Sequence, residues 1–214
     1  MTVEDIRTVA RNALPFSSAA EVGQMWERVA LDWATEKSDS GHICLVREKV
    51  AELVGHLPPD SVFLELASGA NNKAYYPKGF DFARVIATDI SKEMLTFLGQ
   101  TNPDIKKKII ADARVTLPFL SDSVDAALCF FGMRYFENQE EVLRQLIRVT
   151  KPGGYIGVAD YDYYVYDGAV CTFDPCRLQV AILADGHLVT VQQLSQPLFK
   201  GTPTLYFLTI VVKK

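Results

Sequence analysis

The sequence predicts an α/β fold in which a mostly parallel, doubly wound sheet is covered by helices on both faces. From about residue 62 onward, short apolar runs alternate with stretches of helical periodicity. These runs lack polar alternation, which is typical of parallel strands buried on both faces. With 214 residues, 49% of them hydrophobic, the chain is long enough for one large core. A single domain over residues 1–214 is therefore expected.

The first 57 residues contain no strand-like run, and we expect them to form a helical cap in front of a core that spans residues 58–214. Helices are predicted over residues 20–37 and 44–55. Trp26 and Trp33 lie near helical spacing in the first of them. This spacing favours packing into the core, and a lid over a ligand site is the alternative interpretation.

Seven strands are expected in the sheet. The first five, in chain order, are residues 62–66, 84–88, 108–111, 126–131 and 155–159. Residues 187–194 and 203–214 are rich in β-branched and aromatic side chains, and prolines and a glycine separate them. They predict a C-terminal antiparallel hairpin added to the parallel strands.

Two of the intervening helices have recognisable ends. Ser91 is expected to cap the helix that starts at residue 92, and Gly99 to end it. Asn138 precedes the next helix, with Glu141 three residues later as a capping partner. The stretch Lys-Pro-Gly-Gly at residues 151–154 should stop that helix.

Acidic side chains stand where three successive predicted strands end. Glu65 closes the first strand, Asp89 follows 24 residues later, and Asp112 follows the third strand. Ligands bind at the carboxyl ends of parallel strands, and an acid at the second position can accept from the hydroxyls of a ribose. An acid at the third can accept from an exocyclic amine. No phosphate-binding glycine motif is present, so the pattern indicates a nucleoside without phosphate, preferably a cationic one.

Five motifs, in order across about 100 residues, resemble those of the class I S-adenosylmethionine-dependent methyltransferases. They are ELASGA (65–70), ATDISKEML (87–95), ADA (111–113), LPF (117–119) with DSVD (122–125), and RVTKPGG (148–154). Residues 25–30 and 131–135 are similar to segments of the methyltransferase type 11 group, which includes the ubiquinone and menaquinone C-methyltransferases. The resemblance implies a Rossmann-like fold and S-adenosylmethionine as cofactor.

The resemblance also implies a role for individual residues. Glu65 and the backbone of residues 67–70 would contact the methionine part of the cofactor, Asp89 the ribose, and Asp112 the adenine. The full expected set is Glu65, Ala67, Ser68, Gly69, Asp89, Ile90, Met94, Asp112, Ala113, Phe130 and Phe131.

The loop after the first strand departs from the family pattern. Ala67 and Asn71 stand where glycines are common, and Gly69 alone remains. Because Asn tolerates the left-handed conformation, Asn71 is expected to let the loop close. The segment between residues 72 and 82 is short, so the usual long first helix should be curtailed.

The expected activity is transfer of a methyl group to an oxygen, carbon or nitrogen of a small organic acceptor by in-line displacement. A general base would assist if the acceptor must lose a proton. The candidates are Tyr135, Asp160, Tyr161 and His187, and spacing singles out none of them. Tyrosines at 155–166 suit either a flat, apolar acceptor or packing of the nearby strands. The alternative function is a non-catalytic regulatory or assembly subunit that keeps the fold and binds the cofactor weakly or not at all.

The composition does not favour a nucleic-acid-binding protein, a metalloprotein or a membrane protein. A net charge of −4 and a pI near 5.4 argue against nucleic acid as partner. The cysteines and histidines fit no common metal-site spacing, so no metal is expected. No apolar run reaches the length of a membrane span, and residues 1–16 do not resemble a signal peptide, which favours a cytoplasmic location. The acceptor and the oligomeric state stay open, with a homodimer as one option.

Overall fold

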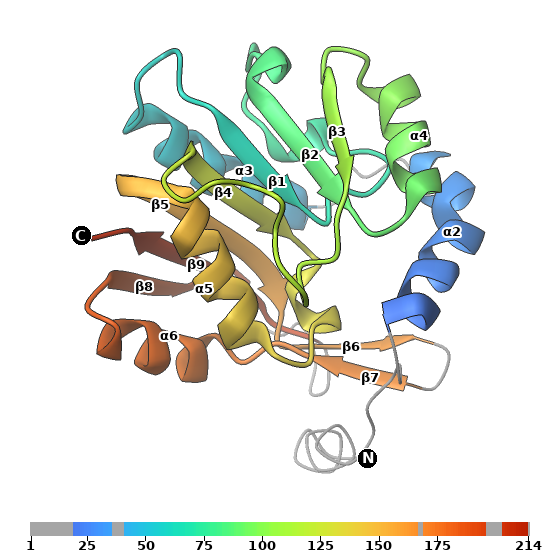
Figure 1. The fold of residues 1–214 in the computed structure, drawn as a ribbon. Coiled ribbons are helices and arrows are strands. Elements are labelled where there is room, and N and C mark those ends of the chain that lie inside the picture. The colour runs from blue at the N-terminus through green and yellow to red at the C-terminus, as the bar shows by residue number, and fades with distance from the viewer. Residues whose placement is uncertain (1–18, 36–40, 167–168, 196–202, 214) are drawn as a thin grey trace.

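The computed structural model describes residues 19–35, 41–166, 169–195 and 203–213. Its main sheet has seven strands in the order β3-β2-β1-β4-β5-β9-β8 (Figure 1). The strands are β1 (Phe63–Leu66), β2 (Val85–Asp89), β3 (Lys107–Ile110), β4 (Val124–Phe130), β5 (Thr150–Tyr161), β8 (Leu188–Gln193) and β9 (Leu205–Val211). The first five are parallel, and β9 is antiparallel to both β5 and β8. The predicted Rossmann-like fold with its C-terminal antiparallel pair is thereby confirmed.

Helices cover both faces of this sheet, as continuous apolar strands require. Helices α5 (Gln139–Val149) and α6 (Pro175–Ala184) pack on one face, and α3 (Gly41–Gly55) and α4 (Lys92–Thr101) on the other (Figure 1). Side chains of β1 alternate between the two cores. Leu64 and Leu66 join the cluster under α5 and α6, whereas Phe63 joins the cluster under α3 and α4. Helix α2 (Ala19–Thr35) lies against α4.

The expected helix caps are present, but one helix ends later than predicted. The Ser91 hydroxyl accepts from the Met94 N–H at 3.1 Å, and the Asn138 side chain accepts from the Glu141 N–H at 3.4 Å. Gly99 does not end α4, which continues to Thr101 because the Asn102 N–H still bonds the Leu98 carbonyl at 2.8 Å.

The connection from β1 to β2 contains two short 3-10 turns, η1 (Lys73–Tyr75) and η2 (Phe82–Arg84), where a long first helix is usual. This agrees with the expected curtailment. The rings of Tyr76, Phe80 and Phe82 pack on one another with centroids 4.6–5.3 Å apart, and they fill the space beside β1. The connection is therefore held by aromatic packing rather than by helical hydrogen bonds.

A second sheet, formed by β6 (Tyr163–Tyr166) and β7 (Ala169–Thr172), follows β5 and was not expected from the sequence. In the ranges that the structure describes, no helix is long and apolar enough to cross a membrane.

Candidate active site

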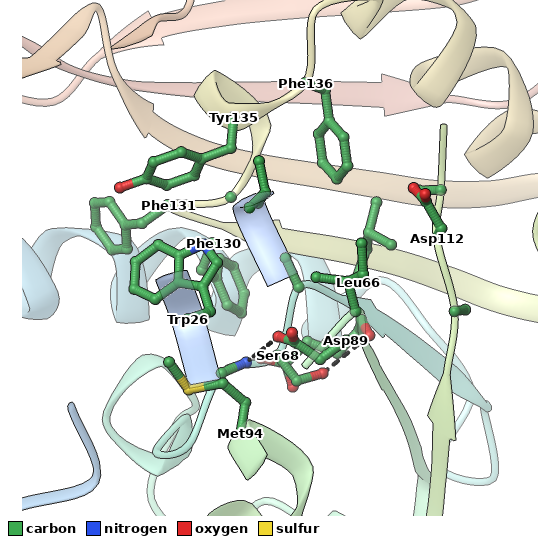
Figure 2. A pocket seen from close by; sticks show the side chains of 18 of the residues that line it. Trp26, Leu66, Ser68, Asp89, Met94, Asp112, Phe130, Phe131, Tyr135 and Phe136 are labelled. Atoms are coloured by element: carbon green, nitrogen blue, oxygen red, sulfur yellow. Dashed lines mark hydrogen bonds between the residues drawn. The ribbon is translucent and has the colours of Figure 1, made fainter. Parts of the chain in front are cut away.

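A pocket opens at the carboxyl ends of the central strands. Its wall comes from the ends of β1, β2 and β4, from the loop after β3, and from α2 (Figure 2). All eleven residues expected to meet the cofactor line this pocket. The geometry brings them together, and their individual roles stay predictions.

Glu65 is the most deeply placed charged group of the pocket, with an exposed fraction of 1%. Its Oε2 accepts from the side-chain amide of Asn72 at 2.5 Å and from the Tyr76 hydroxyl at 2.8 Å. Burial raises the pKa of the Glu65 carboxyl to about 8, although both hydrogen bonds act in the opposite direction. In the pocket without a ligand, the Glu65 carboxyl is therefore protonated at neutral pH.

Asp89 ties the end of β2 to the loop after β1. Its Oδ2 accepts from the Gly69 N–H and its Oδ1 from the Ser91 N–H, both at 2.9 Å. Burial raises the pKa of Asp89, and these backbone donors lower it. Each carboxylate oxygen keeps a further lone pair, so Asp89 can still accept from a diol.

Asp112 already has a partner within the pocket. The Arg114 guanidinium donates from Nε to Oδ1 at 2.9 Å and from its NH2 group to Oδ2 at 3.3 Å. Figure 2 shows Asp112 at one end of the pocket, away from the rings of Trp26, Phe130, Phe131 and Tyr135, with Phe136 between. An amine donor at this end would have to share the carboxylate with Arg114.

The loop after β1 closes by a different route from the one expected. Asn71 lines the pocket without adopting a left-handed backbone, whereas Ala67 has φ of 52° and Gly69 has φ of 62°. Left-handed backbone costs a residue with a Cβ about 1–2 kcal/mol. Phe131, which also lines the pocket, is left-handed as well, with φ of 58°. Such strain is typical of binding sites.

Aromatic rings gather at the end of the pocket opposite Asp112 (Figure 2). The Trp26 indole meets the Tyr135 ring edge to face at a centroid distance of 5.2 Å. The Tyr75 ring lies 5.1 Å from that of Phe130 and 5.6 Å from that of Phe131. This end offers a flat, apolar compartment next to the polar one.

Of the four candidate bases, Tyr135 is the one that lines the pocket. Burial raises the pKa of its hydroxyl to about 12, so it is protonated at neutral pH. Tyr135 can therefore donate a hydrogen bond to a ligand, but it is a poor base.

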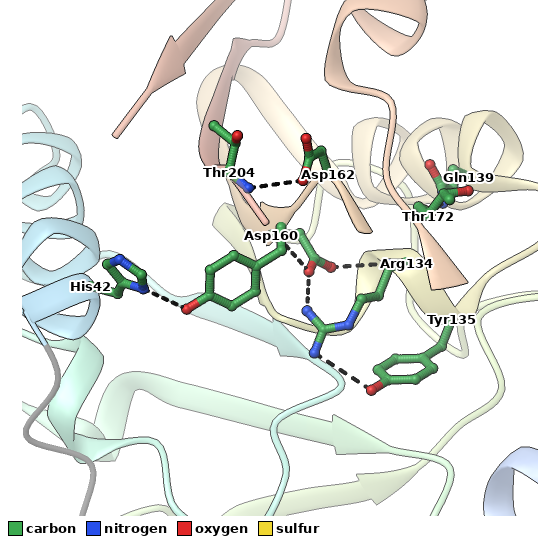
Figure 3. A network of polar contacts seen from close by, with 9 residues as sticks. His42, Arg134, Tyr135, Gln139, Asp160, Asp162, Thr172 and Thr204 are labelled. Carbon is green, nitrogen blue, oxygen red and sulfur yellow. Dashed lines mark hydrogen bonds and ion pairs between the residues drawn. The ribbon is translucent and has the colours of Figure 1, made fainter. Parts of the chain in front are cut away.

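The other three candidates do not line this pocket, and their role as bases stays a prediction that the geometry of the pocket does not support. Asp160 is fully buried in an ion pair with Arg134 and has no access to a ligand (Figure 3). The Tyr161 hydroxyl lies 2.8 Å from His42 Nδ1, and its ring packs behind Phe131. His187 precedes β8, which runs parallel to β5, so it lies at the opposite edge of the sheet, where its Nδ1 accepts from the Lys213 N–H.

Several pocket residues were missed by sequence reasoning or left undecided. Trp26 lines the pocket and also packs against two small buried clusters, so both interpretations stay open, and the side chain of Trp33 lies outside the described residues. Val22, Tyr75, Arg114 and Phe136 also line the pocket, and no motif marked them. Among the described residues, no group of three or more His, Cys, Asp or Glu side chains could hold a metal ion.

The fold and pocket define a Rossmann-like α/β protein with a pocket at the acidic ends of its parallel strands, where proteins of this class bind ligands. A sequence model of the family described as a methyltransferase domain matches residues 64–158. The demethylmenaquinone methyltransferase of Renibacterium salmoninarum is 32% identical over 146 residues, which are 67% of this chain and 60% of that protein. The chain thus spans less than two thirds of the length of this relative.

Solved structures agree in fold. An S-adenosylmethionine-dependent methyltransferase from Aquifex aeolicus superposes with a TM-score of 0.58 at 18% identity, over 82% of this chain and 95% of that one. The [4+2]-cyclase SpnF superposes with a TM-score of 0.70 at 14% identity, over 94% and 99%. The chain belongs to the class I S-adenosylmethionine-dependent methyltransferase superfamily.

Proposed function

We propose that this chain binds S-adenosylmethionine and transfers its methyl group to a small, flat acceptor of the quinol type. The observation that carries the proposal is one pocket with an acidic end and an aromatic end. The acidic end suits a cationic nucleoside, and the aromatic end suits a ring.

The pocket fits the cofactor by its chemistry. The ionisable acidic and basic side chains that line it are Glu65, Asp89, Asp112 and Arg114, and Arg114 is bound to Asp112. The remaining surface favours a positive ligand, and a phosphate group would meet repulsion. Asp89 would hold the ribose, and Glu65 the ammonium group of the methionine part.

The acceptor class rests on two supports. The name of the Renibacterium relative gives demethylmenaquinone as its acceptor. In the present chain, Trp26, Tyr75, Phe130 and Phe131 surround a space of matching character. Aromatic rings pack on one another with a gain of about 0.5–1.5 kcal/mol per pair beyond simple burial.

When bound, the cofactor supplies an electrophilic methyl group to a nucleophile in line with its sulfur. The chain has to align the acceptor and exclude water. Trp26 and Phe131 would close the aromatic end, and the protonated Tyr135 hydroxyl would orient an acceptor oxygen. Because Tyr135 is protonated and the other three sequence-predicted bases do not line the pocket, an acceptor that enters already ionised fits this site best.

The test is transfer of label from methyl-tritiated S-adenosylmethionine to reduced 1,4-naphthoquinone. We expect labelled product from the wild type and little from Asp89→Ala. Binding of S-adenosylhomocysteine without any label transfer to the quinol would reject the acceptor class.

A non-catalytic subunit is the second candidate function. The left-handed Ala67 favours it, because a strained loop with a single glycine can weaken cofactor binding. The likeness to a cyclase also illustrates that this fold serves other purposes. Calorimetric titration separates the two functions, since absence of binding of both S-adenosylmethionine and S-adenosylhomocysteine would favour the subunit.

A further inference from the structure

The surroundings of Glu65 are more enclosed than a ligand contact alone requires. Asn72 and Tyr76 come from the connection between β1 and β2, and both are buried with exposed fractions of 0% and 2%. The Asn72 side-chain oxygen in turn accepts from the side-chain amide of Asn102 at 3.2 Å. A chain of neutral donors thus holds one carboxyl oxygen at the base of the pocket.

No cation balances Glu65 among the residues that act on it. The titratable groups that do so are Tyr76 and Asp89, and the Cys129 thiol on β4 is close enough to be affected by a charge on Glu65. Both hydrogen bonds, from Asn72 and from Tyr76, go to Oε2, which leaves Oε1 to carry a proton or to meet a ligand. A buried carboxylate with only neutral donors and a second acid nearby favours the protonated form.

We propose that Glu65 is protonated in the protein without cofactor, and that an ammonium-bearing cofactor binds with release of this proton to solvent. Asn72 and Tyr76 are the positioning residues, because they fix the carboxyl and stabilise its charge once the proton has left. This inference rests on the proposed function, since the ammonium group belongs to the cofactor assigned there.

Calorimetry measures the proton directly. Titration of S-adenosylhomocysteine at pH 7 in phosphate and in Tris, whose heats of ionisation differ, should show release of about 0.9 proton per ligand, as a pKa of about 8 requires. Methylthioadenosine lacks the ammonium group and should bind without this release. Equal heats for S-adenosylhomocysteine in both buffers would overturn the proposal.

Tyr76→Phe tests the positioning role, because it removes one oxygen and keeps the ring. Loss of a hydrogen bond to a charged group should lower the affinity of the variant for S-adenosylhomocysteine about 10-fold at pH 7. The deficit should shrink to about threefold at pH 8.5, where Glu65 ionises in both proteins. A packing defect would leave the deficit independent of pH, and that result would refute the role.

Tyr155→Phe is the matched control. Tyr155 lies near the amino end of β5 and stacks on His56 at 5.6 Å, away from the pocket, so its loss of one hydroxyl should leave affinity unchanged. Equal effects of both substitutions would also overturn the proposal.

A measurement without cofactor separates this inference from the proposed function. Because the folded state holds a proton that the unfolded state has lost, the urea midpoint of the wild type should fall relative to Glu65→Gln as pH rises from 5 to 8. If the urea midpoints of the two proteins change in parallel with pH, Glu65 is not protonated in the folded state and the proposal is overturned. If midpoints diverge but S-adenosylhomocysteine never binds, the proposed function and the coupling fail while Glu65 protonation stands.

Discussion

Gly132 and Ala67 lie side by side in the pocket lining, and their close approach can be tested by a double-mutant cycle. A Cβ built at Gly132 would lie 2.6 Å from the Cβ of Ala67 and 3.3 Å from the Sγ of Cys129. The first distance is far inside ordinary contact, so Gly132→Ala must displace the strained loop after β1. Overpacking of this kind costs about 1–3 kcal/mol.

Ala67→Gly acts on the same contact from the other side. It relieves left-handed strain of about 1–2 kcal/mol, but glycine adds about 0.5–1 kcal/mol of conformational entropy to the unfolded chain. The single variant should therefore be more stable than the wild type by roughly 0–1.5 kcal/mol. In the double variant the 2.6 Å contact is gone, and only the tight approach to Cys129 remains.

Urea unfolding measures the three variants, with the midpoint as readout and the slope as a check on two-state behaviour. We expect Ala67→Gly to recover most of the loss caused by Gly132→Ala, which corresponds to a coupling of about 1–2 kcal/mol. Gly55→Ala, with nothing within 4 Å of the added carbon, is the control and should cost little. If the effects of the two substitutions on the free energy of unfolding add within about 0.5 kcal/mol, the Ala67 Cβ is not what makes a side chain at position 132 unfavourable.

Three further outcomes follow from the site and its surroundings. Asp89→Ala should weaken S-adenosylhomocysteine binding by about 10-fold or more in calorimetry, since a charged acceptor of the ribose is lost; an unchanged dissociation constant would reject the ribose assignment. Asp160→Asn should lower the free energy of unfolding by about 3–5 kcal/mol, because the buried Arg134 guanidinium loses its counter-charge; a denaturation midpoint equal to that of the wild type would contradict this. Tyr135→Phe should lower the rate of methyl transfer more than cofactor affinity, and equal losses in both would point to a role in cofactor binding.

The sheet was predictable because most of its strands are short, continuous apolar runs with clear breaks between them. The convergence of Glu65, Asp89 and Asp112 on one pocket was predictable for a related reason, since parallel strands bring their carboxyl ends to one edge. The end of α4 was misplaced because a glycine inside a helix costs only about 1 kcal/mol, which the burial of Leu98 offsets.

The positions and partners of the candidate bases could not be predicted from the sequence. His187 stands next to a strand, but the polarity of β8 places it at the far edge of the sheet. Asp160 stands at a strand end like the true pocket acids, and only the structure shows that Arg134, 26 residues away, occupies it. Tyr76 carries no motif, and its link to Glu65 depends on the unusual path between β1 and β2.

The position of β9 has a consequence for how the molecule assembles. Although β8 precedes it in the chain, β9 lies between β5 and β8 and supplies the neighbour through which β8 joins the sheet. On the ribosome, residues 188–193 therefore emerge without a strand to pair with until residues 205–211 follow. Non-local pairing of this sort slows folding and exposes strand edges meanwhile. A stop codon before residue 205 would thus remove two strands from the sheet by deleting one.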